Sequence, residues 1–373
     1  MCKLAARLRL AGQSNRLNAM KNVLAVLALL LVAVTVLPLL RVDYWWIRIF
    51  DFPRGQIALV GVVLAILYVV LWSSLRASEI ILLVLLVLAV GVQAIILFPY
   101  SVLMPKQVAT ATFDSPDNRL SLLVVNVMMD NRQSQALLKI VEDYNPDIIL
   151  TMETDDWWER ALRPLEQAYP HTLKHPLDNT YGMLVHSRLA LIDPDIRFIL
   201  KDDIPSMHMQ VVLPSDERVF VHFVHPDPPN PKYAIDTTKR DAELLIIGRE
   251  VDQRDVPTLI AGDLNDVPWS STTRLFKRAS GLLDPRVGRG MYNTFDARFP
   301  VLRWPLDHVL MSRHFKLVQL EVGPAWGSDH FPLFITIQLT PEARNEQTDT
   351  DTSASQAAQV SEKIEEGRQQ RDD

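Results

Sequence analysis

The chain has 373 residues, of which 48% are hydrophobic and 22% are charged, a length that allows two or three structural units. Cys2 is the only cysteine, which excludes an internal disulfide and excludes thiol chemistry in the soluble part of the chain. Residues 112–340 carry 24 Lys and Arg against 32 Asp and Glu, and this net charge of −8 argues against a tight binder of duplex nucleic acid.

Three long apolar runs occupy the first hundred residues, namely Asn22–Leu40, Gln56–Trp72 and Ile80–Phe98. Each run is almost free of charge and close to the ~20 residues that a helix needs to cross the hydrocarbon layer. Buried core helices are one alternative, and a cleaved signal peptide is another for the first run. Three such runs in succession favour a transmembrane domain of three helices over residues 22–98.

The basic residues before the first run predict the orientation of this domain. They are Lys3, Arg7, Arg9, Arg16 and Lys21, and they favour a cytoplasmic N-terminus over residues 1–21. Three crossings then predict a multi-pass protein of the bacterial inner (cytoplasmic) membrane, with everything after Phe98 periplasmic or otherwise extracytoplasmic. A start at Met20 instead of Met1 would remove most of these basic residues and weaken the prediction.

After a linker over residues 99–117, the pattern changes to alternating strands and helices. A nearly continuous apolar strand over 118–127 carries Asn126 near its end. Ser134 suits a helix N-cap, and apolar residues at helical spacing follow it as far as Asn145 and Pro146. The next strand, 147–152, delivers Glu153, and Asp155 or Asp156 can cap a further helix.

The same order of elements returns about a hundred residues later. A strand over 219–224 delivers His225, a helix runs from Thr237 or Thr238 to about Val251, and the next strand ends at Asp263. Further strands are expected over 181–188, 306–311 and 334–339. Two strand-helix-strand blocks with polar residues at the strand ends predict two similar halves facing one cleft, in an α/β sandwich and not a Rossmann fold.

The segment GDLN places Asp263 and Asn265 two residues apart at the end of a strand. Their side chains then point to the same side, so that the carboxylate can accept a proton or hold a cation while the carboxamide donates to an oxyanion. The plain structural alternative is an Asx turn after a strand.

Six motifs in order resemble the endonuclease/exonuclease/phosphatase superfamily, which shares the deoxyribonuclease I fold. They are Asn126 in VVNV, Glu153 in PDIILTME, His225 in VHPDPP, Asp263 and Asn265 in GDLN, Asp307 in PLDHVLMS, and Asp329 with His330 in GSDHFPL. The resemblance covers residues 118–340 and implies a four-layered α/β sandwich. It also implies a divalent cation, magnesium with manganese as the alternative, and in-line hydrolysis of a phosphate ester by an activated water.

The resemblance also implies a role for each motif residue. Glu153 would be the principal metal ligand, with Asn126 and Asp329 beside the metal. Asp263 would orient or deprotonate the attacking water, and Asn265 and His225 would bind the phosphate. Asp307 would orient His330 and favour its charged form, whereas the following His308 would face the other side of the strand and serve the structure.

The substrate stays open at this point. The apolar runs and the acidic charge favour a lipid head group or a small phosphodiester over nucleic acid, although a basic rim of Arg132, Arg286, Arg289 and Arg303 would favour an extracytoplasmic endonuclease. A catalytically inactive, membrane-tethered binding module is the alternative from another class. The polar residues 341–373 predict a disordered tail, and nothing in the sequence indicates an oligomeric state.

Overall fold

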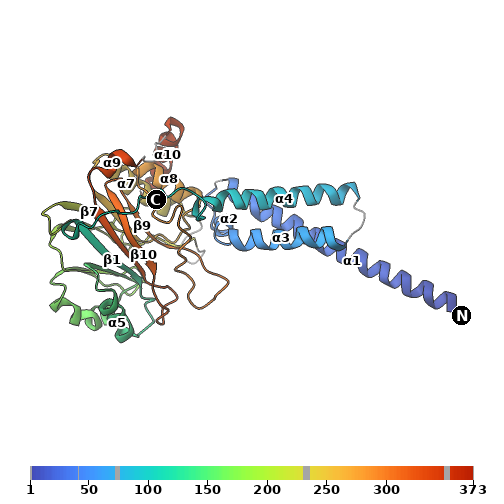
Figure 1. Cartoon of the computed structure of the whole chain (residues 1–373), viewed down its shortest axis with the longest axis horizontal. Helices are drawn as coiled ribbons and strands as arrows, with labels where there is room; N and C mark the ends of the chain where they lie inside the picture. The colour runs from blue at the N-terminus through green and yellow to red at the C-terminus, as the bar shows by residue number, and fades with distance from the viewer. Residues whose placement is uncertain (1, 41, 72–75, 230–235, 348–352, 373) are drawn as a thin grey trace. The chain divides into compact units, whose positions relative to one another are not determined.

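The computed structural model describes residues 2–40, 42–71, 76–229, 236–347 and 353–372. It divides into two compact units (Figure 1), the first being Met1–Val42 with Trp46–Phe98 and the second Asp43–Trp45 with Pro99–Asp373. The first unit is a small helical bundle, and the second holds every strand that the described residues form.

The main helices of the first unit are α1 (Cys2–Val36), α3 (Arg54–Leu71) and α4 (Ala77–Leu97). Shorter helical turns are η1 (Leu37–Leu40), α2 (Trp45–Arg48), η2 (Ile49–Asp51) and η3 (Phe98–Tyr100). Three segments, Asn18–Leu40, Arg54–Leu71 and Ala77–Tyr100, are long and apolar enough to cross a membrane. They agree with the predicted runs, except that Trp72, the last residue of the second run, lies outside the described residues.

The first sheet of the second unit has six strands in the order β10-β11-β1-β2-β4-β3. Their bounds are β1 (Arg119–Asn126), β2 (Ile148–Met152), β3 (His171–His175), β4 (Met183–Ser187), β10 (Phe315–Val322) and β11 (Leu333–Leu339). Only β1 and β2 run parallel to each other, because α5 (Ser134–Tyr144) connects them as a crossover. Ser134 begins this helix, and Gln133 holds the cap position that the sequence analysis gave to Ser134.

The second sheet has five strands in the order β5-β6-β7-β8-β9. Their bounds are β5 (Leu191–Arg197), β6 (Ser206–Val212), β7 (Arg218–Phe223), β8 (Thr258–Asp263) and β9 (Asp307–Met311). The parallel pair is β7 with β8, joined by α7 (Thr238–Asp252). Each sheet therefore contains one of the two strand-helix-strand blocks that the sequence predicts.

The two sheets pack face to face and helices cover their outer faces. Alternate residues such as Leu122 and Val124 of β1 and Val221 of β7 fill the core between the sheets. Outside the first sheet lie α5 and α6 (Asp156–Leu162), which begins at the predicted cap Asp155, and outside the second lie α7 and α8 (Ser271–Ser280). Figure 1 shows α5 and α7 on opposite sides of the strands. This arrangement confirms the predicted four-layered α/β sandwich.

The remaining helical turns of this unit are η4 (Pro116–Asn118), η5 (Arg163–Gln167) and α9 (Ala343–Glu346). Four strands and two helices of this unit were not predicted from the sequence, namely β3, β5, β6, β10, α8 and α10 (Ala354–Asp372). Two of these strands are irregular in their pairing. A register shift interrupts β5 and another interrupts β10, so neither shows the uniform alternation by which a strand is recognised.

The expectation of a disordered tail over 341–373 does not hold for α10 (Ala354–Asp372). Val360 and Ile364 lie one helical turn apart and are buried against α7 and α8. Gly367 allows the close approach, since a Cβ atom there would lie 2.3 Å from Cβ of Ala242. Lys363 of the same helix forms ion pairs with Asp43 and Asp241. Average composition does not reveal that two apolar side chains of a polar helix lie on one face.

Candidate active site

The ends of the two parallel strand pairs bring the predicted site residues together. Asn126 is the last residue of β1 and pairs with Met152, so Glu153 follows directly at the end of β2. Asp263 is the last residue of β8 and pairs with Asp307, the first residue of β9. Because parallel strands end at the same edge, each sheet delivers its polar side chains to one place.

The side chain of Asn126 connects the two halves of the site. Its Nδ2 atom donates to Oε1 of Glu153 at 2.8 Å and to Oδ2 of Asp263 at 3.2 Å. Its Oδ1 atom accepts from the backbone N–H of Met128 at 3.0 Å, which fixes the orientation of the amide. A single buried carboxamide therefore holds two carboxylates from different sheets next to each other.

His330 lies between two carboxylates. Its Nδ1 atom is 2.7 Å from Oδ2 of Asp307, and its Nε2 atom is 3.5 Å from Oδ2 of Asp263. Burial lowers the pKa of His330, but the negative charges of Asp307 and Asp263 outweigh burial and raise the pKa to about 10. The imidazole is therefore protonated at neutral pH, with Nε2–H directed towards the Asp263 side of the site.

Burial raises the pKa of the Asp263 carboxyl to about 7, although the positive charge of His330 opposes this shift. The backbone N–H of Asn265 donates to its Oδ1 atom at 2.8 Å. Gly262, the residue before Asp263, has φ of +144°. A Cβ atom at this position would lie 1.9 Å from the carbonyl oxygen of Val224. The glycine of GDLN is thus required for the close passage of β8 beside β7.

Glu153 is the carboxylate best suited to a divalent cation. Burial raises the pKa of its carboxyl, and the hydrogen bond from Asn126, the charge of His330 and the backbone N–H of Met129 compensate the charged form only in part. Its backbone has φ of +61°, an uncommon conformation for glutamate, and such strain concentrates at functional sites. A bound cation would supply the missing compensation, and carboxylate oxygen is the ligand that magnesium prefers.

Asp263, Asp307 and His330 also form a group whose potential ligand atoms lie within 4.8 Å of one another. We do not assign the metal to this group, because a protonated imidazole has no lone pair for a cation. Glu153, with Asn126 beside it, fits a metal better. Asp329 lies at the margin of the site, where its Oδ2 atom is 3.4 Å from Nη2 of Arg298 and its charge contributes to the raised pKa of Glu153.

The two predicted phosphate-binding residues reach the site from the second sheet. The Nε2 atom of His225 is 3.9 Å from Oδ2 of Asp263, and its buried Nδ1 atom has no hydrogen-bond partner among the described residues. Burial, reinforced by the charge of His330, lowers the pKa of His225 to about 4 and keeps the ring neutral. Asn265 has φ of +49° and donates from Nδ2 to the carbonyl oxygen of Pro226 at 2.9 Å.

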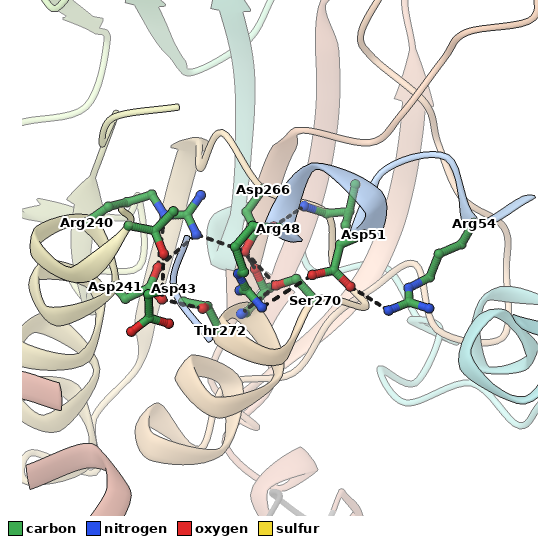
Figure 2. A network of polar contacts seen from close by, with 12 residues as sticks. Asp43, Arg48, Asp51, Arg54, Arg240, Asp241, Asp266, Ser270 and Thr272 are labelled. Carbon is green, nitrogen blue, oxygen red and sulfur yellow. Dashed lines mark hydrogen bonds and ion pairs between the residues drawn. The ribbon is translucent and has the colours of Figure 1, made fainter. Parts of the chain in front are cut away.

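A buried polar network lies beside the GDLN turn, and Figure 2 shows its members Arg240, Asp241, Asp266 and Thr272. The Nη1 atom of Arg240 donates to the carbonyl oxygen of Asn265 at 3.3 Å, and its Nη2 atom lies 2.8 Å from Asp241 and 3.6 Å from Asp266. Thr272 donates to Asp241 at 2.6 Å. The sequence analysis missed this network, because Arg240 lies on a helix 25 residues from Asn265.

Two further residues that the sequence analysis missed hold the segment around His330. The hydroxyl of Ser328 donates to the carbonyl oxygen of Asn126 at 2.8 Å and accepts from the backbone N–H of His330 at 3.0 Å. Ser328 stands in the motif GSDHFPL, which could have indicated it. Nothing local indicates Arg298, which reaches Asp329 through the fold of its loop.

His308 has the structural position that the sequence analysis predicted, bonded to the carbonyl oxygen of Asp266 at 2.8 Å and to Arg286 at 2.8 Å. The predicted basic rim is wrong at Arg286, which is 2% exposed and paired with Asp284. Arg132 is exposed as predicted, and its charge is paired with that of Asp155. The carboxylate of Asp284 is what holds Arg286 in the interior.

Solved structures of similar fold agree with this architecture. The humanized D. rerio TDP2 with 14 mutations has a TM-score of 0.50 and 14% identity, with 59% of this chain and 99% of that chain covered. Truncated Caenorhabditis elegans TDP2 has a TM-score of 0.50 and 17% identity, with 60% of this chain and 100% of that chain covered. The human Nocturnin catalytic domain with bound sulfate anion has a TM-score of 0.50 and 16% identity, with 61% of this chain and 96% of that chain covered. At these identities the similarity concerns the fold alone.

No curated protein matches the sequence. A family profile does match, over residues 123–330, which is more than half of the chain and includes every site residue described above. The chain therefore belongs to the Endonuclease/Exonuclease/phosphatase family.

Proposed function

We propose that this protein is a membrane-anchored, magnesium-dependent phosphoesterase that hydrolyses a phosphodiester by in-line attack of water. The observation that carries the proposal is the bridge that Asn126 makes between Glu153 and Asp263 at 2.8 and 3.2 Å, beside the Asp307–His330 pair. The proposed base, imidazolium and metal-binding carboxylate therefore lie next to one another. Such a set suits hydrolysis of a phosphodiester, because both the ester and hydroxide are anionic and their charge has to be neutralised.

Asp263 would accept the proton of the attacking water, because a carboxyl with a pKa of about 7 can both hold and release a proton near neutral pH. His330, charged and oriented by Asp307, would donate from Nε2 to a phosphoryl oxygen as negative charge grows there. His225 and Asn265 would contact the same phosphate from the second sheet.

A divalent cation would be held by Glu153 with Asn126 and Asp329 beside it, and its chemistry is to neutralise phosphate charge and polarise the ester oxygen. Magnesium is the expected ion and manganese the alternative. The raised pKa of the buried Glu153 carboxyl supports this assignment, since a cation would favour the charged form.

The three apolar helices support an anchor in the inner (cytoplasmic) membrane with the catalytic unit in the periplasm or otherwise outside the cytoplasm. Asp43–Trp45, from the connector between the first two of these helices, belongs to the catalytic unit. The backbone N–H of Thr237 donates to the carbonyl oxygen of Asp43 at 3.0 Å. This assignment supports a topology in which the first connector and the catalytic unit would lie on the same side of the membrane, as three crossings would require.

We expect purified full-length protein in detergent to hydrolyse a bis-aryl phosphodiester with magnesium and not with chelator. Asp263→Ala should abolish that turnover. Sphingomyelin and single- and double-stranded DNA in parallel would identify the substrate class. No turnover of any substrate by folded, magnesium-binding protein would instead support a catalytically inactive, membrane-tethered binding module.

A further inference from the structure

A short loop beside the site exposes apolar side chains. Phe299 is 53% exposed, Val301 71% and Leu302 45%, and we call these three residues the apolar tip. Arg298 and Arg303 flank the apolar tip on the two sides of the loop. Arg303 packs over the ring of Phe331 at 4.8 Å, and its buried Nε atom has no hydrogen-bond partner within the described residues. A cluster of exposed apolar side chains next to arginine is typical of a binding surface.

The base of this loop is built into the catalytic segment. Phe295 forms isolated β-bridges with both Trp304 and His330, and its ring centroid lies 4.9 Å from that of His330. The backbone N–H of Ala297 donates to the carbonyl oxygen of Asp329 at 2.7 Å. The loop that carries the apolar tip is therefore attached by backbone hydrogen bonds to Asp329 and Phe331, the two neighbours of His330.

The chain passes from the third apolar helix into the catalytic unit with almost no residues between them. Helix α4 ends at Leu97, and Pro99 already belongs to the catalytic unit. The hydroxyl of Tyr100 donates to the carbonyl oxygen of Pro268 at 2.9 Å, five residues beyond Asp263. The predicted linker has little slack, because Val108 is fully buried in the core between the sheets.

We propose that the apolar tip enters the interfacial layer of the bilayer that holds the helices, and that the substrate of the site is a membrane lipid with a phosphodiester head group. This inference rests on the function proposed above. Amphipathic segments bind at this layer by burying apolar side chains among the acyl chains while cationic side chains meet lipid phosphates. The apolar tip with Arg303 beside it has this composition.

Single-stranded nucleic acid fits the loop less well. Proteins that bind single strands stack bases on aromatic or guanidinium planes, and two of the three tip residues, Val301 and Leu302, are aliphatic. Residues 112–340, which form most of the catalytic unit around this loop, carry 24 basic and 32 acidic residues. Their net charge of −8 opposes the binding of a polyanion such as nucleic acid. Transfer of exposed aliphatic side chains from water into hydrocarbon lowers their free energy, which favours a bilayer as the partner of the apolar tip.

The first test measures insertion without any need for activity. Cys2 is the only cysteine, so Cys2→Ser with Leu302→Cys places a single environment-sensitive dye on the apolar tip of the full-length protein. The matched control is Phe113→Cys, which is 57% exposed and precedes β1, at the end of the sheet opposite Asn126. In nanodiscs of phosphatidylcholine, whose phosphodiester head group carries no net charge, brominated lipid should quench the dye at 302 and not at 113. Equal quenching at both positions, or none at 302, would overturn the proposal.

The second test compares two substrates in one preparation. The triple variant Phe299→Ser, Val301→Ser, Leu302→Ser should lower the ratio of vesicle-lipid turnover to soluble bis-aryl diester turnover at least tenfold, whereas Phe113→Ser should leave that ratio unchanged. An unchanged ratio in the triple variant, or loss of single-stranded DNA cleavage in its place, would overturn the lipid inference. Absence of soluble-diester turnover in the wild type would refute the proposed function, and the quenching measurement would then decide the docking of the tip separately.

Discussion

Nδ1 of His330 donates to Oδ2 of Asp307 across 2.7 Å, and Oδ1 of the same carboxylate is buried without a hydrogen-bond partner among the described residues. One oxygen of Asp307 therefore orients the imidazole of His330. The negative charge of the carboxylate favours the protonated form of that imidazole. The acid–base behaviour of the site depends on this pair, which brings together residues 23 positions apart.

Asp307→Asn should move the alkaline limb of the pH–rate profile to lower pH. Burial lowers the pKa of His330, and the carboxylate of Asp307 is the largest effect that raises it to about 10. Without that charge the imidazolium loses its proton at lower pH, and we expect kcat/KM at pH 8 to fall by about 10² or more. A profile measured from pH 5 to 10 checks the shift, and a uniform loss at every pH would show that only geometry was disturbed.

Glu153→Gln should abolish the response of stability to magnesium while leaving the fold intact. Wild-type protein at a magnesium concentration ten times its Kd should gain about 1.4 kcal/mol, because the ion binds only the folded state. Thermal unfolding with magnesium and with chelator measures this gain. Glu243→Gln is the matched control, since Glu243 is also a buried glutamate but lies on α7. An undiminished magnesium response in Glu153→Gln would remove Glu153 from the metal site.

Glu243 should make the protein less stable as pH rises. Burial and the charge of Asp227 raise its pKa in the folded state to about 8, above the ordinary value of 4.5. Its contribution to stability is therefore fully present below pH 4.5 and is lost as pH rises to about 8, on the order of 1 kcal/mol per pH unit. Denaturant unfolding of Glu243→Gln should lack this slope between those pH values. A parallel decline in variant and wild type would assign the slope to other groups.

Arg240→Met should be strongly destabilising, by about 3–5 kcal/mol, because it leaves Asp241 and Asp266 buried beside an uncharged side chain. It should also lower kcat through the lost hydrogen bond to the carbonyl oxygen of Asn265. Arg197→Met is the control, since Arg197 pairs with Glu250 at 31% and 28% side-chain exposure and should cost only about 0–1 kcal/mol. Similar free energies of unfolding for the two variants would contradict the role of the Arg240 network.

Local patterns in the sequence predicted the apolar helices, most central strands and the motif residues at their ends. Strands such as β1, β2 and β8 are fully or almost fully buried, so each appears in the sequence as a continuous apolar run that ends in a polar residue. The family resemblance added the sandwich and the roles of the motif residues. Local sequence determines these features because backbone preference and side-chain polarity act over only a few residues.

The tertiary structure alone decided which groups meet. Asn126 contacts Asp263 across 137 residues, Arg298 reaches Asp329, and Arg286 is buried against Asp284 instead of facing solvent. The docking of α10 through Val360 and Ile364 likewise depends on the surface that α7 presents. Such contacts follow from the sheet register and the packing of distant elements, and no periodicity in the chain records them.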